Sequence, residues 1–160
     1  MSLNYSGESG AMNEGQADYF ACSLSKDYKL GEWAVAKMGK EYLRTLINDL
    51  HYPEDIQGEV HADGKIWGAL MWDVRTALGS AISDPLIHGS HYYLKSGSPT
   101  FLDGYNSMIT ADENLFAGKY SKKIYEIFKK RGITADAYNG AAMTRQQVVS
   151  ARKFREAHKE

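Results

Sequence analysis

The sequence predicts an all-α protein, and two observations support this fold class. Apolar residues recur at helical spacing in several separate segments, whereas few segments show the alternation that is typical of strands. The 160 residues are 43% hydrophobic and 12% aromatic, which is the composition of a globular domain large enough to bury a core. We therefore expect amphipathic helices packed around a single core.

The charge and the cysteine content exclude several classes of protein. The formal net charge of −1 gives no reason to expect nucleic acid or an anionic membrane as a partner. No apolar run in the sequence is long enough to span a bilayer. The single cysteine, Cys22, excludes an internal disulfide and a cysteine-based zinc site, and its apolar neighbours predict a buried side chain rather than a nucleophile.

The first predicted helix runs from Gly10 to Ser23 and carries two carboxylates, Glu14 and Asp18. Their i,i+4 spacing places both on one face, one turn apart. Like charges at this spacing repel each other, and carboxylates on a face that must pack are costly to bury unpaired. We therefore expect a cation or a histidine against them, although a solvated helix edge would also account for two carboxylates alone.

The next apolar residues lie between Leu30 and Ile47, at a roughly helical spacing that Gly39 interrupts, so this stretch is expected to be partly helical. A polar loop over residues 51–58 then leads to the clearest helix of the chain. Its apolar residues follow a spacing of 3.6 from Ile66 to Leu78, and Gly79 is expected to end it.

Three further helices are expected over residues 81–96, from 98–100 to 117–118, and from 120 to 132. Residues 134–160 predict a basic, solvated terminal helix that Thr144 caps, with binding of an acidic partner as the alternative. His88 and His91 are three residues apart and could share a helical face. Two histidines can bind a metal ion, but the sequence shows no third ligand beside them.

The segment from Tyr5 to Asp18 resembles the thermolysin family of zinc metallopeptidases. It has the form Tyr-x-x-Glu-Ser-Gly-Ala-Met-Asn-Glu-x-x-x-Asp, and in this family such a segment carries the third zinc ligand. The resemblance implies that Glu14 is the zinc-binding carboxylate and that Asp18 orients a zinc-ligating histidine. It also implies that Tyr5 donates a hydrogen bond to the oxyanion of the tetrahedral intermediate.

A second segment, Tyr42-Leu43-Arg44-Thr45-Leu46, resembles the substrate-arginine segment of the same family. By this resemblance, Arg44 binds a peptide carbonyl of the substrate on the primed side, and Leu43 lines the apolar pocket there. An arginine suits this role because its rigid, permanently charged fork presents several donors. A surface salt bridge from Arg44 to Glu41 or Asp49 is the alternative.

A third segment, Gly-x-Val-His over residues 58–61, also resembles this family, and the residues after it are similar to the fungalysin relatives. The resemblance implies that His61, when protonated, stabilises the oxyanion. A helix-start histidine without a function is the alternative. Asp55, six residues earlier, is the first candidate for the carboxylate that pairs with His61, and Glu54 and Glu59 are its rivals.

The resemblance covers residues 4–133 and implies the helical C-terminal lobe of a thermolysin-like or fungalysin-like zinc endopeptidase. Such an enzyme also needs two histidine ligands and a general-base glutamate from H-E-x-x-H on a preceding helix, and this motif does not occur in the sequence. We therefore expect the C-terminal half of a protease that is inactive as an isolated chain. Residues 1–3 resemble a cloning start, and residues 134–160 are expected to form a C-terminal extension.

The resemblance also implies partners, a compartment and a cofactor. It implies two partners, which are a peptide or protein substrate and an upstream domain that carries H-E-x-x-H. It also implies that the parent protein is secreted and that the intact enzyme binds zinc. Calcium has little support, because Ser25 stands where the family has a carboxylate and Asp27 and Glu32 do not replace it. The rival hypothesis is a non-catalytic helical binding or structural module derived from the same scaffold.

Overall fold

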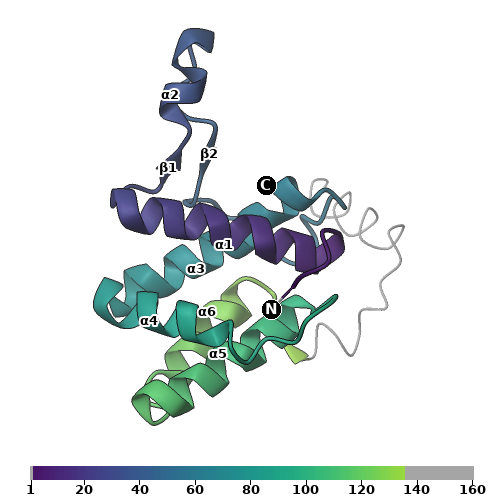
Figure 1. Cartoon of the computed structure of the whole chain (residues 1–160), viewed down its shortest axis with the longest axis vertical. Helices are drawn as coiled ribbons and strands as arrows, with labels where there is room; N and C mark the ends of the chain where they lie inside the picture. The colour runs from purple at the N-terminus through teal and green to yellow at the C-terminus, as the bar shows by residue number, and fades with distance from the viewer. Residues whose placement is uncertain (1, 136–160) are drawn as a thin grey trace, which may run out of the picture.

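The computed structural model describes residues 2–135, and these residues are mostly helical, which confirms the predicted fold class. The elements, in chain order, are α1 (Gly7–Ser25), β1 (Lys29–Leu30), α2 (Glu32–Val35), the 3₁₀ helix η1 (Ala36–Met38), β2 (Arg44–Thr45), α3 (Val60–Leu78), α4 (Ser80–Ser90), α5 (Phe101–Phe116) and α6 (Ser121–Lys130). Figure 1 shows α3 between α1 and a layer formed by α4, α5 and α6.

Helix α3 is the central element, and it confirms the helix predicted over residues 66–78. Its fully buried side chains Ile66, Leu70 and Val74 recur every four residues, and Met71, three residues before Val74, is also fully buried. The helix begins earlier than the apolar pattern, at Val60, because the Glu59 carboxylate accepts hydrogen bonds from two N–H groups of its first turn. It ends where predicted, at Gly79.

Helices α1 and α3 touch backbone to backbone. A Cβ atom added to Gly15 would lie 2.6 Å from the carbonyl oxygen of Gly64 and 2.7 Å from the nitrogen of Gly68. Only residues without a side chain permit this approach, which is closer than real Cβ contacts. The glycines therefore fix the position of Glu14 on α1 relative to the first turns of α3.

The core lies between α3 and the helices beneath it. The Trp67 ring stacks on Phe101 of α5 at 5.2 Å between centroids and meets Phe128 of α6 edge-on at 5.8 Å. Gly104 of α5 lies directly under the Trp67 ring, where a Cβ atom would collide with it. Cys22 is also fully buried, as predicted. These aromatic contacts tie the C-terminal helices to α3.

Residues 29–45 form an arm, and the predicted partly helical stretch is helical only over residues 32–38, before Gly39. The antiparallel strands β1 and β2 pair Lys29 with Thr45 and Leu30 with Arg44, and only one short turn of helix, α2, with the 3₁₀ turn η1 lies between them. Figure 1 shows this arm standing away from the helices. Its apolar spacing does not mark a single buried helix face, because Trp33, Met38 and Leu43 are exposed.

The remaining boundaries differ from the predictions by a few residues. Helix α1 extends beyond both predicted ends, and α4 ends at Ser90 instead of residue 96. Helix α5 begins after Thr100 with a capping box that Asp103 completes. The predicted helix with Thr144 at its start lies outside the described residues. Within residues 2–135, no helix is both long and apolar enough to cross a membrane.

Candidate active site

The site is built on the face of α1 that carries Glu14 and Asp18. His61 lies against Glu14, and Arg44 lies against Asp18. The expectation of a cation or a histidine is therefore confirmed. The two side chains are largely covered, with 20% of Glu14 and 11% of Asp18 exposed.

Glu14 is held from two sides. The Tyr5 hydroxyl donates a hydrogen bond of 2.5 Å to Glu14 Oε1, and His61 Nε2 lies 3.4 Å from Glu14 Oε2. The hydrogen bond to Glu14 raises the pKa of the Tyr5 phenol. Tyr5 precedes α1 and His61 is in the first turn of α3, so the α1–α3 contact brings all three side chains together.

Asp18 is bound by one edge of a guanidinium group, through two hydrogen bonds. Arg44 Nε and Nη2 donate hydrogen bonds of 2.7 and 2.6 Å to the two carboxylate oxygens. The charge-assisted pair raises the pKa of Arg44. Arg44 lies in β2, so this bidentate pair also anchors the base of the arm to α1. The sequence reasoning proposed Glu41 or Asp49 as the alternative partner, but Glu41 pairs with Lys29.

The carboxylate beside His61 is Glu59, which was one of the rivals. His61 Nδ1 lies 2.8 Å from Glu59 Oε1, and the same carboxylate accepts from the backbone N–H groups of His61 and Ala62. The contact with Glu59 raises the pKa of His61, and the contact with His61 lowers the pKa of Glu59 to about 2. Asp55 accepts a hydrogen bond of 2.7 Å from the backbone N–H of His51.

Asp63 supports the same turn and was missed by the sequence reasoning. Its side chain is buried, and its two oxygens accept hydrogen bonds of 2.7 and 3.0 Å from the N–H groups of Gln57 and Gly58. Burial raises the pKa of this carboxyl. The signal was present in the sequence, because an acidic residue in the first turn of a helix can bind the N–H groups of the preceding loop.

Comparison with known proteins identifies the family of the chain. Residues 1–133 match the family described as thermolysin metallopeptidase, alpha-helical domain. The chain belongs to this family. It is 28% identical over 174 residues to extracellular metalloproteinase 4 of Arthroderma gypseum, which covers 86% of the chain and 27% of that protein.

Other relatives of this thermolysin-family chain carry the same description. It is 26% identical over 166 residues to extracellular metalloproteinase 4 of Trichophyton soudanense, covering 81% of the chain and 42% of that protein. The same identity over 166 residues holds for the protein of that name from Trichophyton rubrum, covering 81% of the chain and 26% of that protein. The thermolysin-family chain thus spans well under two thirds of the length of these relatives.

The described residues of the thermolysin-family chain do not complete a zinc site by themselves. A catalytic zinc ion takes three protein ligands, and residues 2–135 contain no group of three or more histidine, cysteine, aspartate or glutamate side chains that could hold a metal ion. Glu14 has the chemistry of one zinc ligand.

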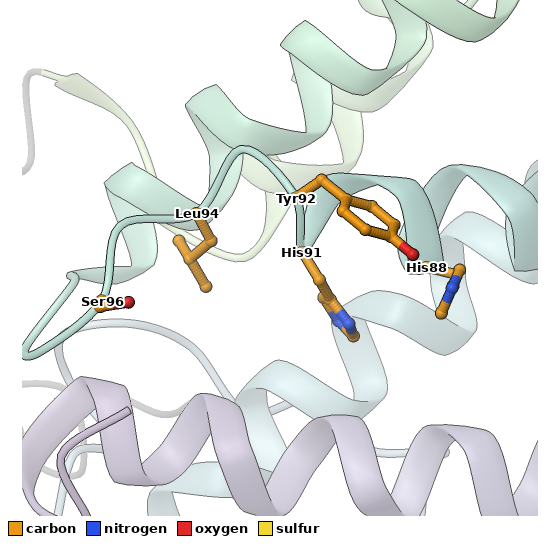
Figure 2. A pocket seen from close by; sticks show the side chains of 5 residues that line it. All are labelled: His88, His91, Tyr92, Leu94 and Ser96. Carbon is orange, nitrogen blue, oxygen red and sulfur yellow. The ribbon is translucent and has the colours of Figure 1, made fainter. Parts of the chain in front are cut away.

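A second concave region lies at the C-terminal end of α4. Figure 2 shows His88, His91, Tyr92, Leu94 and Ser96 lining a pocket of about 480 Å³. The two imidazole rings are 6.0 Å apart, and burial lowers the pKa of His91. No third metal-binding side chain joins them within the described residues. The family resemblance assigns no role to this pocket.

Proposed function

We propose that this chain is the C-terminal half of a zinc-dependent endopeptidase. Glu14 supplies one ligand of the zinc ion, and an upstream H-E-x-x-H segment of the parent protein supplies two histidines and the general-base glutamate. When bound, zinc activates a water molecule and polarises the peptide carbonyl. The observation that carries this proposal is the convergence of Tyr5, His61 and Arg44 on the Glu14–Asp18 face of α1.

Tyr5 and His61 have the positions needed to stabilise an oxyanion. Both side chains are substantially exposed, and both contact Glu14. The Tyr5 hydroxyl and the His61 Nε2 atom therefore lie next to the proposed zinc ligand. Because Glu59 engages His61 Nδ1, the Nε2 atom is the one that faces the site. The raised pKa of His61 favours the imidazolium, which stabilises negative charge that develops in the transition state.

Arg44 and Leu43 would receive the substrate on the primed side. Asp18 engages Nε and Nη2 of Arg44, so it fixes the plane of the guanidinium and leaves Nη1 as the nitrogen that would reach a peptide carbonyl. Leu43 is exposed next to Arg44 on the arm, where an apolar substrate side chain would contact it. The substrates are therefore proposed to be peptides or proteins with an apolar residue after the scissile bond.

The isolated chain is proposed to be inactive, because its sequence contains no H-E-x-x-H motif to supply the other two zinc ligands and the general base. Its similarity to proteins named extracellular metalloproteinases supports secretion of the parent protein.

The parent protein, with all of its coding sequence, provides the test. We expect it to hydrolyse a protein substrate, a chelator to abolish the hydrolysis, and zinc to restore it. Glu14→Gln is expected to lower the rate at least 100-fold, since even residues that only orient zinc ligands contribute 10- to 100-fold. Glu113→Gln, at an exposed position on α5, is the matched control and is expected to leave the rate unchanged. A chelator-resistant rate, or full activity of Glu14→Gln, would contradict the proposed zinc mechanism, and absence of hydrolysis in the parent protein would support the non-catalytic module.

A further inference from the structure

The pocket at the C-terminal end of α4 brings two imidazole rings together, and the proposed function does not use it. Figure 2 shows His88 and His91 projecting from this end of α4 toward α1. Their ring centroids are 6.0 Å apart. Two imidazoles that bind one metal ion, each through a metal–nitrogen bond of about 2.1 Å, have centroids no more than about 6.5 Å apart. The spacing of the two rings is therefore one that a shared metal ion permits.

Phe20 of α1 restrains both rings. It meets His88 edge-on at 6.3 Å between centroids and His91 edge-on at 5.9 Å. The Tyr92 ring also packs edge-on against His88, at 5.8 Å. Side chains whose orientation is already fixed by packing lose little conformational freedom when they bind a ligand. The aromatic contacts thus hold the two imidazoles beside each other before any ion binds.

His91 also has a ring nitrogen that lacks a hydrogen-bond partner. Its Nε2 atom is buried, and no atom of the described residues forms a hydrogen bond with it. A buried polar atom of this kind is unfavourable and calls for a bound ion or water molecule. Burial lowers the pKa of His91, so the ring is neutral at pH 7 and keeps a lone pair that a metal ion can accept.

The chemistry of the pocket selects a class of metal ion. Besides the two histidines, the described residues that line it are Tyr92, Leu94 and Ser96, and none of them carries a carboxylate. Calcium and magnesium ions prefer several oxygen ligands, above all carboxylates, whereas imidazole suits zinc, copper and nickel. Two protein ligands leave the other coordination positions to water, so binding is expected to be weaker than at a site with three.

We propose that His88 and His91 together bind one divalent transition-metal ion, at a second site that shares no residue with the candidate active site. The proposal is independent of the proposed function, since it needs neither an upstream segment nor hydrolysis. His88 is in the last turn of α4 and His91 directly follows the helix, so the ion ties this turn to the residue after it. A ligand that binds only the folded state raises the melting temperature.

Zinc binding to the metal-free 160-residue chain, measured by isothermal titration calorimetry, tests the proposal. We expect His88→Gln and, separately, His91→Gln to weaken binding at this site at least tenfold, since even residues that only orient metal ligands contribute about 10- to 100-fold. His51→Gln, in the loop before α3, is the matched control and is expected to bind as the wild type does. Zinc is also expected to raise the melting temperature of the wild type and not that of His88→Gln.

Two further measurements separate this site from other metal-binding groups. With copper in place of zinc, electron paramagnetic resonance is expected to show two coordinated ring nitrogens in the wild type and one in His88→Gln. Glu14→Gln alters the candidate active site and is expected to leave the binding at the end of α4 unchanged.

Unchanged zinc affinity in His88→Gln overturns the proposal, and this variant is expected to fold because His88 is exposed. Zinc binding that Glu14→Gln abolishes and His88→Gln retains also overturns it, since the ion would then lie at the candidate active site. Hydrolysis by the parent protein is not a readout here, so a failure of this proposal and a failure of the proposed function are distinguishable.

Discussion

Glu59 has two roles at the start of α3. It caps the helix by accepting from the N–H groups of His61 and Ala62, and it contacts the His61 ring at Nδ1. One carboxylate thus fixes the turn from which His61 projects and the nitrogen that His61 presents to Glu14. The sequence reasoning ranked Asp55 above Glu59, because the expected carboxylate precedes the histidine by several residues; the cap geometry favours the residue two positions away.

The Glu59–His61 contact is expected to make the stability of the chain depend on pH. The lowered pKa of Glu59 adds stability above its ordinary value of 4.5, and this is lost as the pH falls towards about 2. The raised pKa of His61 adds stability below 6.5, which is lost as the pH rises through the raised value. The pair therefore stabilises the chain most between about pH 4.5 and 6.5.

Replacing Glu59 with glutamine keeps a hydrogen-bonding side chain but removes its charge. We expect Glu59→Gln to lower the pKa of His61 and to flatten the dependence of the melting temperature on pH across this window. Titration of the imidazole protons by NMR, in the isolated chain, measures the first effect, and Glu113→Gln serves as the control for a general loss of negative charge. An unchanged His61 pKa would show that Glu59 does not act on the ring.

The Arg44–Asp18 pair is largely covered, so breaking it leaves a carboxylate without its partner. We expect Arg44→Ala to lower the free energy of unfolding by about 2 kcal/mol, as for other buried groups that lose a hydrogen-bond partner. The double variant Arg44→Ala, Asp18→Ala should lose less than the sum of the single variants. Urea unfolding of the four proteins measures this coupling, and additive losses would mean that the pair contributes nothing specific.

At the scale of elements, the contact between α1 and α3 positions the whole site, and it depends on glycine. We expect Gly15→Ala to lower the free energy of unfolding by about 1–3 kcal/mol, since the added methyl group meets the α3 backbone. Gly89→Ala is the control, because its methyl group meets only the end of the half-exposed Leu115 side chain, which can move. Equal unfolding curves for the two variants would contradict the close approach.

Periodicity predicted the helices whose apolar faces are buried and failed where the apolar residues are exposed. Helix α3 follows the 3.6-residue pattern because α1 and the C-terminal helices cover it on two sides. The arm contains apolar residues at a similar spacing, but its helical turns α2 and η1 are short, and Trp33 and Met38 on them are exposed instead of packing against the core. A single sequence does not distinguish apolar residues that pack within the chain from apolar residues that are exposed.

At the scale of the whole molecule, residue spacing and the family resemblance predicted different features of the candidate site. The i,i+4 carboxylates alone predicted a cation or a histidine beside them, and Arg44 and His61 confirm it. The resemblance alone assigned roles to Tyr5, Arg44 and His61, which the fold brings to one face of α1. The Asp18–Arg44 pairing required coordinates, because it depends on how the arm returns to α1.

The central claim is that Glu14 ligates zinc together with residues from the upstream segment of the same parent protein. The most direct measurement is the zinc content of the purified parent protein and of its Glu14→Gln variant, after dialysis against metal-free buffer. The account predicts about one zinc ion per wild-type molecule and a loss of most of it in the variant, with the fold unchanged by circular dichroism. Equal zinc in the two proteins, or none in either, would contradict it.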